Sequence, residues 1–70
     1  MRRLYASRRI ESVGHQTPDS QKWIARVMVS WGEEGRETFQ PLKPEDTFDS
    51  VAEAEAWGIR YGKKWIDHDR

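Results

Sequence analysis

Every second residue from Trp23 to Trp31 is apolar. The odd-numbered positions of this segment hold tryptophan, alanine and valine, all of which are apolar. A repeat of two residues is the pattern of a β-strand with one face against a core. The segment is therefore predicted to be a strand whose odd-numbered side chains point inward. Its outward positions are Ile24, Arg26, Met28 and Ser30.

Turn residues and a second apolar segment follow this strand. Gly32-Glu33-Glu34-Gly35 has a glycine at each end and is predicted to be a turn. Residues 36–40 are predicted to return as the partner strand, which Pro41 and Pro44 should end. Upstream, residues 7–13 are predicted to form a third strand, and residues 14–21 the loop that leads into Trp23.

The last third of the chain carries the pattern of a capped amphipathic helix. The Ser50 hydroxyl can accept a hydrogen bond from the Glu53 amide, and a glutamate three residues after a serine is typical of a capping box. Apolar residues then recur at helical spacing, with Trp57 within the apolar arc. We predict a helix that begins after Ser50 and ends near Trp65. Glu55 points near the apolar arc and therefore needs a partner or an exit to solvent.

Small residues recur every four positions along this helix, at Ala54, Gly58 and Gly62. A glycine inside a helix costs about 1 kcal/mol relative to alanine, so two glycines one turn apart suggest that another backbone packs close to the helix axis. Packing on the sheet is the first interpretation. A helix–helix contact between two copies is the alternative.

These elements predict an α+β fold: a three-stranded antiparallel meander with one C-terminal amphipathic helix packed on one face. We expect residues 1–6 to be a flexible basic arm, residues 7–67 a single β-β-β-α domain and residues 68–70 a frayed tail. One helix covers only one face of such a sheet. The other face is therefore the candidate binding surface, with Ile24, Arg26, Met28 and Ser30 on it.

Composition narrows the functional classes. Twelve basic and twelve acidic residues give a net charge of zero, and the absence of cysteine excludes disulfides and thiolate zinc sites. No apolar stretch is long enough to suggest a membrane span, so we expect a soluble, cytoplasmic protein with no membrane partner. A chain of 70 residues buries a small core, which favours support by oligomerisation.

Candidate chemistry is sparse. His15 lies near Ser12, Thr17 and Asp19 in a predicted loop, where polar residues ordinarily form turns and caps. Asp67-His68-Asp69 could hold a divalent cation but closes the chain, where residues fray. We expect no catalytic residue, no metal and no cofactor, and the roles of His15 and His68 stay open.

Two segments carry a resemblance to known families. Trp23-Ile24-Ala25-Arg26-Val27 precedes a hairpin, and Phe48-Asp49-Ser50-x-x-Glu53-Ala54 then leads to Trp57. This arrangement resembles small bacterial β-β-β-α proteins of unknown function. It is also similar to the AP2-type DNA-binding domain, which has W-x-A-x-I in its sheet and F-x-T-x-E-E-A-x-x-A-Y in its helix. The second resemblance implies that the sheet face enters the major groove of DNA. The AP2 sheet is rich in arginine, whereas the central strand here offers only Arg26 on its outward face.

The sequence leaves two functional hypotheses. The first is a small, non-catalytic binding or protein-interaction module that self-associates through the open sheet face or a strand edge. Its partner is then another protein or a second copy of the chain. The alternative is nucleic-acid binding through that face and the N-terminal arginines, which the net charge of zero disfavours. Its candidate contacts are Arg2, Arg3, Arg8, Arg9, Arg26 and Arg36.

Overall fold

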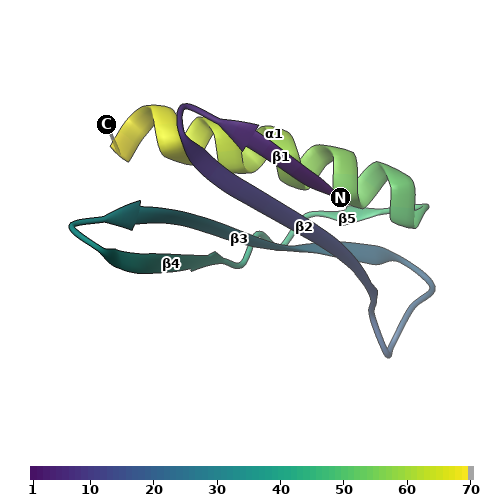
Figure 1. Cartoon of the computed structure of the whole chain (residues 1–70). Helices are drawn as coiled ribbons and strands as arrows, with labels where there is room; N and C mark the ends of the chain where they lie inside the picture. Colours follow the sequence, from purple (N-terminus) through teal and green to yellow (C-terminus); the bar gives the residue numbers. More distant parts are fainter. Residues whose placement is uncertain (70) are drawn as a thin grey trace.

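The computed structural model describes residues 1–69, which form an antiparallel sheet and one helix (Figure 1). The elements are β1 (Arg2–Tyr5), β2 (Arg8–Gln16), β3 (Trp23–Glu33), β4 (Arg36–Leu42), β5 (Thr47–Phe48) and α1 (Val51–Asp69). The sheet order is β1-β2-β3-β4, and β5 pairs with the first residues of β3. The helix packs mainly on β2 and β3. The fold is α+β, with an antiparallel sheet and one C-terminal helix as predicted.

The sheet contains two strands beyond the three that were predicted. β1 occupies most of residues 1–6 and pairs with β2 from Arg2 opposite Glu11 to Tyr5 opposite Arg8. This segment is therefore part of the sheet and not a loose arm. β5 contributes the other additional strand, with Phe48 opposite Trp23. β2 also extends through Gln16, into residues that were predicted to be a loop.

Both two-residue hairpin turns place their central residues at positive φ. Glu34 and Gly35 have φ of 52° and 77°, and Ala6 and Ser7 have φ of 51° and 64°. This is the backbone of a type I′ turn, which usually contains asparagine or glycine. Because alanine and serine give no such signal, the first turn could not be predicted. The second carries a glycine and was predicted.

β4 continues through Pro41 to Leu42 instead of ending before the proline. β4 lies at one end of the β1-β2-β3-β4 path. Proline lacks an amide hydrogen, which a strand needs only where it donates to a neighbouring strand, so an edge strand tolerates it. The prediction that Pro41 ends the strand was wrong for this reason.

The capping prediction for α1 is confirmed. The Ser50 hydroxyl oxygen accepts a hydrogen bond from the Glu53 amide at 3.2 Å. The helix continues past Trp65 to Asp69, because its last turn is attached to the sheet. The Tyr5 hydroxyl donates to Asp67 at 2.8 Å, and the Arg8 guanidinium donates to Asp69 at 2.8 Å. His68 and Asp69 are thus helical and not frayed. Arg70, the remaining residue of the expected tail, lies outside the described residues.

The small residues of α1 form the contact with the sheet. A Cβ atom added at Gly58 would overlap the Ser12 hydroxyl and lie 3.1 Å from the Ala25 Cβ. One added at Gly62 would lie 2.8 Å from the Ile10 Cγ2. Packing on the sheet is therefore confirmed. At these two positions the helix rests on Ile10, Ser12 and Ala25.

Tryptophans surround the core rather than fill it. Trp31, Trp57 and Trp65 are only partly buried and pack against the core from its edge. Arg8 lies over the Trp31 ring, with its guanidinium carbon 4.1 Å from the ring centroid. The Glu55 carboxylate, which needed a partner, accepts a hydrogen bond from the Gly14 amide at 3.0 Å. The buried apolar side chains are Ile10, Ala25, Val27, Val29, Leu42, Ala54, Ile59 and Ile66.

A larger side chain at Gly58 should separate the helix from the sheet. Gly58→Leu is expected to lower the free energy of unfolding by about 3 kcal/mol through overpacking, although leucine favours helices. Urea denaturation followed by tryptophan fluorescence measures the change. The control is Ala52→Leu at an exposed position of α1, which should have little effect. A Gly58→Leu variant as stable as the native chain would contradict the close approach.

Replacing the first turn with residues that accept positive φ should stabilise the protein. A non-glycine residue in this region costs about 1–2 kcal/mol, so the Ala6→Asn, Ser7→Gly double variant is expected to raise the melting temperature by several degrees. Thermal unfolding by circular dichroism measures it. The control is Ser20→Gly in the β2–β3 loop, where φ is not positive and no gain is expected. An unchanged melting temperature of the double variant would show that the turn is unstrained.

Candidate functional site

The sheet face opposite α1 is the candidate binding surface, and we call it the open face. Residues directly opposite one another on neighbouring strands point to the same side of a sheet. Strand register therefore defines rows of side chains across this face. The first row is Leu4, Arg9, Ser30 and Phe39, and the second is Arg2, Glu11, Met28 and Pro41. Further along lie the pair Val13 and Arg26, and then His15, Ile24 and Thr47.

Large apolar side chains are exposed on the open face. Leu4 is 76% exposed, Phe39 is 59% exposed and Val13 is 41% exposed. Met28, between them, and Ile24, one row beyond Val13, are half-buried. Single exposed apolar residues are common, but several on one uncovered sheet face are typical of an interaction surface. Leu4 and Phe39 share the same row, on the two outer strands of the β1-β2-β3-β4 path.

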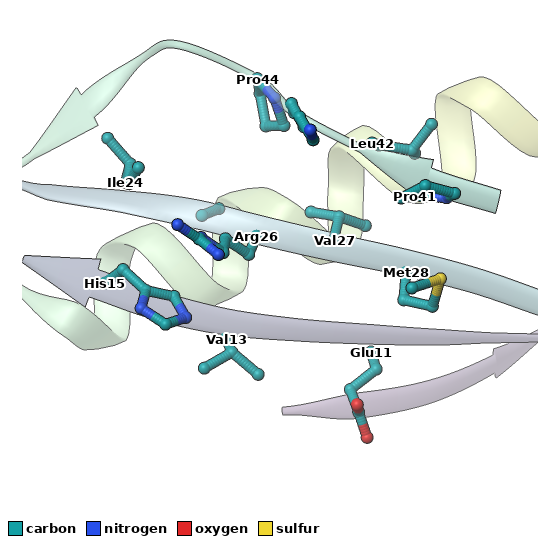
Figure 2. A pocket seen from close by; sticks show the side chains of 12 residues that line it. Glu11, Val13, His15, Ile24, Arg26, Val27, Met28, Pro41, Leu42 and Pro44 are labelled. Atoms are coloured by element: carbon teal, nitrogen blue, oxygen red, sulfur yellow. The ribbon is translucent and has the colours of Figure 1, made fainter. Parts of the chain in front are cut away.

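A hollow of about 460 Å³ opens on this face (Figure 2). Its cause is the path of the chain after β4. Pairing of β3 with β4 ends at Val27 and Leu42, and pairing with β5 resumes at Ile24 and Thr47. Residues 43–46 thus pass opposite only two residues of β3, so this segment bulges away from the strand and leaves a gap beside it.

The hollow combines an apolar lining with charged groups of mostly one sign. Val13, Ile24, Met28, Pro41 and Pro44 supply the apolar part. Arg26 and His15 lie around it, with the Glu11 carboxylate at one end (Figure 2). Lys43 also lines it. Glu11 accepts a hydrogen bond from the Arg2 guanidinium at 2.7 Å, which offsets its charge. The hollow therefore offers basic groups beside an apolar wall, an arrangement that suits a carboxylate on a partly apolar ligand.

Of the four residues predicted for this surface, three lie on it as expected. Ile24 and Met28 are half-buried, and Arg26 is exposed. Ser30 has the predicted orientation but is only 6% exposed, because it lies between the longer side chains of Arg9 and Phe39 in its row. Ser30 is therefore a buried position below the surface and does not present its hydroxyl to a partner.

The six arginines proposed as nucleic-acid contacts do not form one patch. Register places Arg2, Arg9 and Arg26 on the open face, but Arg3 and Arg8 on the other face. Arg36 lies beside the turn between β3 and β4.

Acidic partners neutralise several of these side chains. Arg8 is bound to Asp69, Arg2 to Glu11, and the Arg9 guanidinium lies 3.8 Å from the Glu37 carboxylate. Among residues 1–69, Arg26 makes no ion pair within 4 Å.

Sequence reasoning missed Leu4, Val13, Phe39, Glu11 and Lys43 as parts of this surface. Phe39 lay within a predicted strand, and alternation along that strand could have placed it outward. Leu4 could not be found, because β1 was not predicted. Lys43 and the hollow depend on where β4 leaves β3, which no local pattern indicates.

Within residues 1–69, neither histidine belongs to a cluster of metal-binding side chains. His15 is exposed at the margin of the hollow, and His68 is exposed in the last turn of α1. The carboxylates beside His68 are engaged, Asp67 by Tyr5 and Asp69 by Arg8. Within the described chain, no three histidine, aspartate or glutamate side chains gather where they could hold a metal ion. No helix in residues 1–69 has the length and apolar character needed to cross a bilayer.

Comparisons with protein-family models, curated proteins and solved structures give no match to this chain.

Two arginine substitutions should distinguish an arginine that stabilises the fold from one that lies exposed on the open face. Arg8→Ala is expected to lower the free energy of unfolding by about 1–2 kcal/mol, because it removes the contact with Trp31 and the ion pair with Asp69. Arg26→Ala should change it by less than about 0.5 kcal/mol, because Arg26 is exposed. Urea denaturation of both variants measures this difference. Equal losses would show that Arg26 has a structural role.

Proposed function

We propose that this chain is a small, non-catalytic protein-interaction module that self-associates through the open face. The exposure of Leu4 and Phe39 in one row of an uncovered sheet face carries the proposal. Burying apolar surface contributes about 25 cal/mol per Å², so these side chains favour a state in which the face is covered. A second copy supplies the same apolar row in the same geometry.

The charges on this face also suit a second copy. Arg2 with Glu11 and Arg9 with Glu37 place both signs on one surface. A surface with mixed charges can meet itself with opposite charges opposed, whereas a nucleic-acid site needs an excess of basic groups. Oligomerisation also supplies the extra support that a small core requires.

The area of the open face determines how strong the self-association is expected to be. Four strands about 4.8 Å apart, with about seven residues each on average, cover roughly 450 Å² in projection. Two such faces give about 900 Å², which is just below the roughly 1,000 Å² of a specific, stable interface. Association is therefore expected to be weak and reversible, in the range of micromolar dissociation constants.

Sedimentation equilibrium tests the proposal. Between about 10 μM and about 1 mM, the average mass is expected to rise toward that of a dimer. Phe39→Lys should keep the chain monomeric over this range, because it replaces an exposed apolar side chain with a cation that would face the second copy. The control is Ala52→Lys on α1, which should leave association unchanged. A native chain that stays monomeric would overturn the proposal, and so would association that Phe39→Lys does not weaken.

Nucleic-acid binding is the second candidate, because Arg2, Arg9 and Arg26 lie on the same face. If it holds, fluorescently labelled DNA or RNA binds at low salt, the affinity falls steeply as salt is raised, and Arg26→Ala weakens it. The self-association proposal instead predicts no binding of either probe at low salt.

A further inference from the structure

Opposite charges lie at the two ends of the open face. The hollow at one end presents Arg26 and Lys43, with His15 at its margin. The β3–β4 turn at the other end carries the exposed acidic residue Glu34. Glu37 follows this turn on the open face, and its carboxylate lies 3.8 Å from the Arg9 guanidinium. The face is therefore polarised along the direction of its strands.

The row that contains Leu4 and Phe39 lies midway between these ends. On β3 this row is occupied by Ser30, four positions after Arg26 and four before Glu34. At about 3.3 Å per strand residue, each charged position is about 13 Å from the row. The exposed apolar side chains thus mark the centre of a surface whose ends have opposite charge.

Two identical sheet faces can stack with two-fold symmetry in two ways. With the axis parallel to the strands, each end of the face meets the same end of the second copy, so Arg26 would approach its own counterpart. With the axis perpendicular to the strands, each end meets the opposite end, so basic groups meet acidic groups. The charges therefore favour the second arrangement.

We infer that two copies stack open face to open face with antiparallel strands, and that Glu34 of each copy enters the hollow of the other. This inference rests on the self-association proposed above. The two-fold axis lies along the row of Leu4 and Phe39, and the carboxylate of Glu34 pairs with Arg26 and Lys43 of the second copy. The hollow is thus a site completed by the second copy.

The side chains at the centre fit this arrangement. Leu4 meets Leu4 of the second copy, and Phe39 meets Phe39, which buries the two most exposed apolar side chains of the face. Arg9 also approaches its own counterpart, but each guanidinium has the Glu37 carboxylate 3.8 Å away. Packed sheets cross at about 30°, so the ends diverge by several ångströms, a distance that arginine and lysine side chains can span.

Charge exchange between two positions tests the arrangement. Arg26→Glu and Glu34→Lys should each weaken dimerisation by about ten-fold at low salt, because each places like charges together twice in the symmetric dimer. An equimolar mixture of the two variants should recover native affinity, since both contacts between unlike copies are then opposite in charge. The double variant Arg26→Glu, Glu34→Lys should also recover it, because it reverses each pair. Sedimentation equilibrium measures all four samples.

The controls distinguish this inference from the proposed function. Lys64→Glu, on the exposed side of α1, changes the net charge by the same amount as Arg26→Glu and should leave dimerisation unchanged. If the native chain dimerises but a mixture of Arg26→Glu with native protein associates more tightly than either alone, the axis is parallel to the strands and the inference is wrong. It is also wrong if either single variant dimerises with native affinity. A monomeric native chain would instead overturn the proposed function itself.

Discussion

The close approach of α1 to the sheet determines which sheet face is covered and which is left open. Gly58 and Gly62 let the helix rest against Ser12 and Ile10, where any Cβ atom would collide with them. The contact fixes the helix along β2 and β3, and the bonds from Tyr5 and Arg8 to the last helical turn keep it there. Because residues 1–69 contain one helix, this packing covers one sheet face and leaves the other to solvent.

Irregular connections between the strands determine the shape and the charges of the open face. The bulge of residues 43–46 away from β3 produces the hollow and brings Lys43 beside Arg26. The tight turn at Glu34 extends the opposite end with acidic groups, and the tight turn at Ala6 adds β1 and therefore Leu4 to the surface. The sheet core and the open face thus depend on different parts of the sequence. The core follows from regular alternation along the strands, whereas the open face depends on the turns and on the edge strand β1.

The features that could be predicted from sequence are those with local causes. Alternation around Val27 indicated β3, and Ser50 with Glu53 indicated the start of α1, because strand faces and helix caps depend on neighbouring residues. β1 was missed because Ala6 and Ser7 adopt positive φ without the usual residues. The outward direction of Arg26 and Met28 could be predicted. The burial of Ser30 and the hollow could not, because they depend on side chains and pairings from strands distant in sequence.

The most direct test of this account is a dilution series of methyl and amide NMR spectra. If the open face is where copies meet, resonances of Leu4, Met28 and Phe39 shift with protein concentration, while those of Ile59 and Ile66 beneath the helix stay constant. Shifts confined to the exposed side of α1, or spectra that do not change with concentration, would contradict the claim that packing of the helix leaves the opposite sheet face free to bind a second copy.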